Sequence, residues 1–324
     1  MRNDDSKRLP ALLAAAHARR AEVREVTTAY RLVDDVEDGF PGLTVDVYGA
    51  FAAISIYEAS AAPAVAPLAR ALVPTYARGV YVKHHERSDL RHRARDDIAP
   101  AAPAEGEPAP DELVVEEHGA RFAVWLADGL STGLFTDQRD NRRTVRAVSR
   151  GARVLNLFSY TCSFTVAAAL GGAVETVSVD LSNRALERGR ANLLRNELSL
   201  DGHRFLHEDA LVYLSRAERR GERFGVVVVD PPSFGTRGKK TFSVERDYGE
   251  LARLATSVLA PGGRLLAVTN HRKTTPARLR ELVLDAVRHA GSSIATLEEP
   301  STPRDHVHRN DGVTPTKSVL VTLS

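Results

Sequence analysis

The chain has 324 residues, a formal net charge of +2, 43% hydrophobic and 27% charged residues, and one cysteine. This length allows two domains, and the composition is that of a soluble globular protein. The single cysteine, Cys162, excludes an intramolecular disulfide and a cysteine-based zinc site. No apolar run approaches the roughly 20 residues of a membrane span, and the polar N-terminus lacks a signal-peptide core. We therefore expect a cytoplasmic protein with no membrane partner.

Residues 1–97 combine helix and strand patterns and predict a small α+β domain for substrate or RNA contact. Elements expected there are a helix over 10–26, a β-hairpin over 43–57, a helix over 64–72 and a strand over 79–82. Residues 98–112 are rich in Pro, Ala and acidic residues, which predicts an exposed linker. Residues 113–130 are expected to form a second hairpin, which turns at His118-Gly119.

The run 83–95 is rich in Lys, Arg and His. Because Lys and Arg side chains can neutralise phosphates, Lys83 and Arg87 are candidate contacts to RNA. A solvated loop is the alternative, since two acidic residues interrupt the run. Its histidines have no carboxylate partners at ligand spacing, so we expect no metal site.

The stretch 153–180 predicts one βαβ unit of a parallel sheet. A short apolar run, 154–157, indicates a buried strand, and an apolar helix over 164–170 ends at Gly171-Gly172. A second strand, 176–179, ends on Asp180. An acidic residue at this place is close to where open α/β sheets bind their ligands.

This layout suits a nucleoside-type cofactor. The Asp180 carboxylate could accept two hydrogen bonds from ribose hydroxyls, and the loop 159–163 leads into a helix N-terminus with unpaired N–H groups. The loop is not GxGxxG, and Phe158, Tyr160 and Thr161 would crowd a dinucleotide pyrophosphate. S-adenosylmethionine, which has no phosphate, fits better. A different nucleotide, or no cofactor, remains the alternative.

The α/β rhythm continues to the end of the chain. Expected elements are a helix over 182–196 capped by Ser182, strands at 205–206, 224–229 and 264–269, a helix over 276–289 and a last strand over 318–323. Four polar residues follow four of the predicted strands: Asp180, Asp209, Asp230 and Asn270. Because parallel strands share one carboxyl edge, these side chains can converge there.

The run Asp230-Pro231-Pro232-Ser233-Phe234 is the most informative of these strand ends. Its prolines stiffen the chain and prevent strand pairing. A planar base could then stack on Phe234, which is worth roughly 1–3 kcal/mol. A simple turn at the end of a strand is the alternative.

Four segments, LNLFSYTCSFTVAAALGGA, SVDLS, VVVDPPSFG and DQRDNR, resemble the motifs of bacterial 23S rRNA methyltransferases that use S-adenosylmethionine. That family has a cytosine-5 branch (RlmI) and a guanine-N7 branch (the RlmK half of RlmKL, and RlmQ). The resemblance covers roughly residues 30–324 and implies a Rossmann-like, seven-stranded class I methyltransferase domain over 131–324. RlmI-like members begin with an RNA-binding PUA domain, and this chain starts too late to hold one. The run DPPSFGTRGKKTFSVERDY and the TNHRK turn resemble the guanine-N7 branch.

The resemblance also implies roles for individual residues. The expected cofactor-binding residues are Phe135, Gln138, Arg139, Asn156, Phe158, Ser159, Tyr160, Asp180, Leu181, Asp209, Ala210 and Asp230. The expected catalytic residues are Asp230, Pro231, Pro232 and Asn270. Substrate binding is expected from Ser233, Phe234 and Arg272, in addition to Lys83 and Arg87.

The target atom follows from nucleophile chemistry. Methylation of cytosine C5 requires a thiolate to add at C6 first. The cytosine-5 branch places a nucleophilic cysteine in the region where this chain has Asn270, and Cys162 is predicted to be a packing residue. Guanine N7 carries a free lone pair and needs only alignment. We therefore expect guanine-N7 methylation of 23S rRNA or a large-subunit precursor.

Other functions stay open at this point. They are cytosine-5 or amino-group methylation of rRNA, methylation of a small molecule or protein, and RNA binding without catalysis. A homodimer is also left open.

Overall fold

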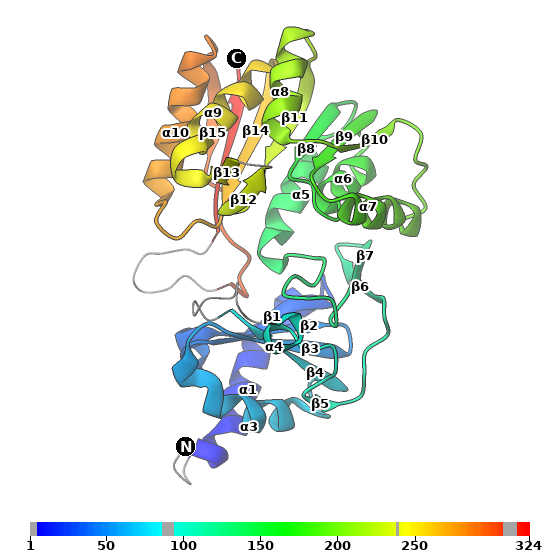
Figure 1. Cartoon of the computed structure of the whole chain (residues 1–324), viewed down its shortest axis with the longest axis vertical. Coiled ribbons are helices and arrows are strands. Elements are labelled where there is room, and N and C mark those ends of the chain that lie inside the picture. The colour runs from blue at the N-terminus through cyan, green and yellow to red at the C-terminus, as the bar shows by residue number, and fades with distance from the viewer. Residues whose placement is uncertain (1–4, 86–93, 238–239, 307–315) are drawn as a thin grey trace. The chain divides into compact units, whose positions relative to one another are not determined.

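A computed structural model describes residues 5–85, 94–237, 240–306 and 316–324. The chain divides into two compact units, coloured mainly blue to cyan and green to red in Figure 1. The first comprises Met1–Thr136 with Pro303–Val307, and the second comprises Asp137–Thr302 with His308–Ser324. Within the described ranges, no helix combines the length and apolar character needed to cross a membrane.

The first unit contains a five-stranded sheet in the order β1-β2-β3-β4-β5, together with a separate hairpin. The sheet strands are β1 (Ala29–Asp34), β2 (Leu43–Tyr48), β3 (Phe51–Ile56), β4 (Gly79–His84) and β5 (Glu105–Gly106), and the hairpin is β6 (Leu113–Glu117) with β7 (Ala120–Val124). The helices are α1 (Asp5–Arg19), α2 (Ala21–Arg24), α3 (Ala62–Leu72) and α4 (Arg95–Ile98). Side chains of α1, α3 and the sheet form one apolar core. Both predicted hairpins are confirmed.

The segment expected to be an exposed linker, 98–112, contains a short strand. Its residues Glu105–Gly106 pair antiparallel with β4, where Gly79 faces Gly106. A side chain at Gly79 would collide with the Glu107 carbonyl, and Gly106 has a positive φ of 78°. Only glycines allow two backbones to approach this closely. The Pro- and Ala-rich composition therefore masked an edge strand.

The second unit is built on the predicted seven-stranded sheet, in the order β10-β9-β8-β11-β14-β16-β15. Its strands are β8 (Arg153–Leu157), β9 (Glu175–Asp180), β10 (His203–His207), β11 (Phe224–Val229), β14 (Leu259–Thr269), β15 (Ile294–Glu298) and β16 (Lys317–Leu323). A short hairpin, β12 (Phe234–Arg237) with β13 (Lys240–Ser243), leaves the end of β11. The helices are α5 (Arg139–Val148), α6 (Ser163–Leu170), α7 (Asn183–Arg195), α8 (Ala210–Arg219), α9 (Val244–Ser257) and α10 (Pro276–His289).

Alternate residues of the central strands enter two different cores. Leu155, Val227 and Val319 belong to the core beneath α8, α9 and α10, whereas Val226 and Leu320 belong to the core beneath α5 and α6. This alternation follows from the period of two along a strand. The predicted Rossmann-like fold is therefore confirmed, with helices on both faces of the sheet (Figure 1).

Candidate functional site

The sheet order brings the predicted polar strand ends to one edge. Strands β10, β9, β8, β11 and β14 are parallel neighbours, so Asp180, Asp209, Asp230 and Asn270 all follow carboxyl ends on the same side. Strand β8 pairs with β9 on one side and with β11 on the other. The chain order reverses at this point, and such a switch point opens a crevice for ligands.

The loop after β8 holds unusual backbone conformations. Phe158, Tyr160 and Cys162 have positive φ values of 56°, 46° and 61°. For residues other than glycine such conformations are strained, and they concentrate at ligand clamps. No side chain caps the start of α6 at Ser163. The helix therefore presents first-turn N–H groups to this edge of the sheet.

Asp180 fixes this loop. Its Oδ2 accepts a hydrogen bond from the Tyr160 backbone N–H at 2.8 Å, and its Oδ1 accepts one from the Ser182 backbone N–H at 2.8 Å. Each carboxylate oxygen has two lone pairs, so both can accept a further hydrogen bond from a ligand. Ser182 caps α7 as predicted, since its hydroxyl accepts from the Ala185 N–H. The assignment of Asp180 to the cofactor ribose stays a prediction.

Cys162, the last residue of this loop, is wholly buried. Burial raises the pKa of its thiol to about 11, so a thiolate is disfavoured at neutral pH. Gly189 of α7 packs directly against it, and a Cβ at this position would lie 2.8 Å from the Cys162 Cβ. These contacts agree with the expectation that Cys162 is a packing residue.

We expect Gly189→Ala to destabilise the second unit, although alanine favours helices by about 1 kcal/mol over glycine. The added methyl group must push Cys162 and the strained loop aside, and overpacking costs typically 1–3 kcal/mol. The thermal unfolding midpoint should fall and cofactor affinity should weaken with it.

Gly249→Ala is the matched control, because its nearest neighbour would be Leu282 at an ordinary 3.7 Å. It should leave the midpoint unchanged or raise it. Adding Cys162→Gly to Gly189→Ala should restore part of the loss, since glycine tolerates the positive φ of 61° at position 162. Equal midpoints for the two alanine variants would contradict the close packing.

Asp230 lies directly after β11 in a setting that favours its neutral form. Burial and the neighbouring Asp137 carboxylate raise the pKa of Asp230 to about 7, although Arg142 acts in the opposite direction. Tyr248, whose hydroxyl donates to the Val268 carbonyl at 2.9 Å, lies close enough to feel the Asp230 charge. Perturbed carboxyl groups of this kind are typical of functional sites.

The end of β14 meets the proline-rich turn through one hydrogen bond. The Ser233 hydroxyl donates to Asn270 Oδ1 at 2.9 Å. Asn270 and Arg272 are exposed, Pro231 is buried and Pro232 is exposed. Phe234 begins β12, and its side chain lies outside the described residues. Ser233 and Asn270 are thus brought together as one wall of the candidate site.

Two of the expected cofactor residues have internal partners. The Asn156 amide donates to Thr165 of α6 at 2.9 Å, and the Thr165 hydroxyl in turn bonds to Ser178. Asn156 therefore anchors α6 to the sheet. The Phe158 ring packs against Phe242 of β13 with centroids 5.7 Å apart. Both residues still border the loop that the prediction assigns to the cofactor.

Gln138 and Arg139 are almost fully buried where α5 begins. The structure places Gln138 at the N-cap of this helix. Asn141 Nδ2 donates to Gln138 Oε1 at 2.7 Å and to the Ser318 hydroxyl at 2.8 Å. The buried Asn141 Oδ1 has no hydrogen-bond partner among the described residues.

The residues predicted to border adenine include both polar and apolar groups. Leu181 is 51% exposed, which is high for a large apolar side chain next to Asp180. Asp209 caps α8 by accepting from the Val212 N–H at 3.0 Å, and Ala210 is the first, buried residue of that helix. An exposed leucine beside polar strand ends suits a planar heterocycle.

The prediction that Lys83 contacts RNA is wrong. Its side chain is 1% exposed, and its ammonium donates to the carbonyls of Leu126 and Gly129. A buried ammonium with these partners supports the loop after β7 and is not available to a phosphate. Arg87 lies outside the described residues. Phe135 belongs to the first unit and is 50% exposed, and its cofactor contact stays a prediction.

Sequence reasoning missed the hydrogen bonds made by the residues at the start of β16. Thr316 donates to Asp137, Lys317 donates to the His271 carbonyl, and Ser318 accepts from Asn141. The only signal in the sequence was a polar Thr-Lys-Ser triplet before an apolar strand, which is indistinguishable from an ordinary strand start.

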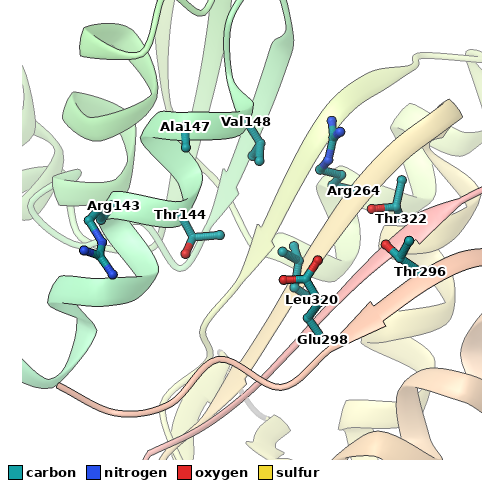
Figure 2. Close-up of a pocket in the computed structure, with 9 residues that line it drawn as sticks. All are labelled: Arg143, Thr144, Ala147, Val148, Arg264, Thr296, Glu298, Leu320 and Thr322. Carbon is teal, nitrogen blue, oxygen red and sulfur yellow. The ribbon is translucent and has the colours of Figure 1, made fainter. Parts of the chain in front are cut away.

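The second unit also has a groove on the α5 side of the sheet, and none of its lining residues is a predicted site residue (Figure 2). Its volume is about 500 Å³. Side chains from α5, β14, β15 and β16 line it: Arg143, Thr144, Ala147, Val148, Arg264, Thr296, Glu298, Leu320 and Thr322. Among the described residues, no cluster of three or more His, Cys, Asp or Glu side chains could hold a metal ion.

Comparisons with known proteins agree with this geometry. A family model described as S-adenosylmethionine-dependent methyltransferase matches residues 38–316. Ribosomal RNA large subunit methyltransferase I from Salmonella arizonae is 35% identical over 279 residues, which are 86% of this chain and 68% of that protein. Its namesake from Aeromonas salmonicida is 35% identical over 286 residues, or 87% of this chain and 71% of that protein.

One solved structure is similar over nearly the whole chain. It is SMU.776, described as a methyltransferase complexed with SAH, at 30% identity and a TM-score of 0.86, covering 98% of this chain and 81% of that one. The matched family model spans most of the chain and includes the whole edge formed by Asp180, Asp209, Asp230 and Asn270. This chain belongs to the S-adenosylmethionine-dependent methyltransferase family.

Proposed function

We propose that the protein methylates a base of large-subunit ribosomal RNA. The observation that carries the proposal is the convergence of Asp180, Asp230 and the Ser233–Asn270 pair at the switch point of the sheet. It is supported by the relatives named ribosomal RNA large subunit methyltransferase I. The cofactor supplies an electrophilic methyl group, and the protein must align the target atom with it.

Residues along the carboxyl edge of the sheet are assigned to the ribose, methionine and adenine parts of the cofactor. Asp180 holds the ribose hydroxyls, and the α6 N-terminus with Ser159 and Tyr160 holds the methionine carboxylate. Leu181, Asp209 and Ala210 border the adenine. Gln138 and Arg139 close the methionine side from the start of α5.

The target base lies against Asp230, Pro231, Pro232 and Asn270, with Ser233 orienting the Asn270 amide. A base inside a folded RNA must leave its stack to reach this wall, which costs a few kcal/mol. Arg272 is exposed next to Asn270 and is suited to a nearby phosphate.

Guanine N7 remains our proposal for the target atom, because the site lacks a usable thiolate. Cys162 is the single thiol of the chain, and it is buried with a raised pKa. The similar relatives carry the name of the RlmI branch, which the family resemblance connects to cytosine-5 modification. Their identity therefore favours C5, whereas the residues of this chain favour an atom that needs no covalent adduct.

A thiol-free variant separates the two targets. Labelled methyl transfer to ribosomal RNA by Cys162→Ala should persist, with nucleotide mapping that places the label on guanine N7. Loss of transfer with unchanged cofactor affinity would assign a catalytic role to Cys162. No transfer to RNA by the parent protein would remove the proposed substrate class, and label in a metabolite or protein fraction would replace it.

Amino-group methylation is the second candidate, and the pKa of about 7 at Asp230 favours it. A carboxylate near neutrality can accept the proton that an exocyclic amino group releases. Mapping of the label to an exocyclic nitrogen, with a rate that rises as pH passes through 7, would select this reaction.

A further inference from the structure

Thr316, which directly precedes β16, and the first two residues of that strand, Lys317 and Ser318, contact both sides of the candidate site. Strand β16 runs antiparallel to β14, and Thr269 pairs with Lys317. The start of β16 therefore lies beside the end of β14, at the edge where the site residues gather. All three residues are at least 92% buried.

Their side chains reach alternate faces of the sheet. Val319 and Val321 enter the core beneath α9 and α10, whereas Leu320 enters the core beneath α5. By the same alternation Lys317 shares the face of Val319, and Thr316 and Ser318 share the face of Leu320. This short segment therefore contacts different elements on the two faces of the sheet.

On the α5 face the segment holds the start of the helix. The Thr316 hydroxyl donates to Asp137, and the Ser318 hydroxyl accepts from Asn141 at 2.8 Å. The same Asn141 amide donates to Gln138 at 2.7 Å. The position of Gln138, a proposed cofactor contact, therefore depends on Ser318.

On the other face Lys317 holds the turn that presents Asn270. Its ammonium donates to the His271 carbonyl at 2.9 Å, and His271 is locked further by Thr274 at 2.9 Å. Burial and the nearby Arg272 lower the pKa of Lys317 to about 8. Burying a lysine costs free energy unless its ammonium is hydrogen-bonded, so the bond to the His271 carbonyl offsets this cost and holds the turn.

We propose that Thr316–Ser318 is a positioning segment, in which Lys317 sets the target-base wall and Ser318 sets the cofactor wall. The proposal rests on the proposed function, since it assumes that the Asn270 turn faces the target and that Gln138 faces the cofactor. It predicts separate effects for two adjacent residues of one strand: substitution of Lys317 impairs use of RNA, and substitution of Ser318 impairs cofactor binding.

Lys317→Met removes the donor at nearly constant volume. It should lower kcat/KM for RNA about tenfold and leave the cofactor Kd within about twofold, because the lost hydrogen bond to the His271 carbonyl lies at the Asn270 turn. Lys317→Gln, which keeps an N–H donor, should restore part of the loss. Ser318→Ala should raise the cofactor Kd about fivefold. Thr322→Ala, on the same strand but away from the edge, is the matched control and should change neither.

Amide hydrogen exchange gives a readout that needs no RNA. Lys317→Met should speed exchange in residues 270–274 and leave 138–142 unchanged, and Ser318→Ala should do the reverse. Effects of both variants on both segments, or on neither, would overturn the proposal. A parent protein inactive on RNA would instead refute the proposed function, and the exchange data would still decide the coupling.

Discussion

Asp180→Ala is expected to weaken S-adenosylmethionine binding at least about 100-fold. The substitution leaves the Tyr160 and Ser182 N–H groups without their acceptor, and each such loss costs about 1–3 kcal/mol. Tyr160 also has a positive φ of 46°, so without this hydrogen bond its strained conformation would relax. The proposed acceptor for the ribose hydroxyls is lost in the same step. Calorimetric titration of the protein with S-adenosylmethionine measures the change directly.

Two variants separate these contributions. Asp201→Ala removes an exposed carboxylate after α7 and should leave the cofactor Kd unchanged. Asp180→Asn keeps one acceptor oxygen and should fall between the parent and the alanine variant. If Asp180→Ala bound the cofactor as tightly as the parent, the ribose assignment would be wrong.

Stability is expected to fall as pH rises from about 4 to 7 because of Asp230. The folded protein raises the pKa of this carboxyl to about 7, whereas an unfolded aspartate titrates near 3.9. Between these values the folded state binds more protons, so each added pH unit favours unfolding by up to about 1.4 kcal/mol. Below pH 4 the stabilisation is fully present, and above 7 it is lost.

Asp230→Asn removes this titration and keeps the shape of the side chain. Its unfolding midpoint relative to the parent should therefore increase from pH 4.5 to 7 and level off above 7. Asp201→Asn, at an exposed carboxylate, should show no such trend. A constant difference between Asp230→Asn and the parent across this range would mean that the Asp230 environment is not as the structure describes it.

The local pattern of the sequence was sufficient for the framework of the second unit. Residues 153–180 form the predicted strand–helix–strand motif. Their apolar runs have the length of buried strands, and Gly171-Gly172 ends the helix between them. The helix expected over 276–289 has those bounds in the structure. The strand ends at Asp180, Asp230 and Asn270 followed from the same strands, because parallel order alone brings carboxyl ends to one edge.

Only the tertiary structure decided what each polar side chain does. A basic run suggested phosphate contact for Lys83, but the structure buries its ammonium against two carbonyls of a loop more than 40 residues away. Cys162 became a packing residue through Gly189 of another helix. The proposed roles of Lys317 and Ser318 depend on hydrogen bonds to His271 and Asn141, which lie 46 and 177 residues away along the chain. Periodicity reports which residues are buried, because burial repeats with the geometry of a helix or strand. It carries no information on hydrogen bonds between distant segments, which exist only once the sheet order is set.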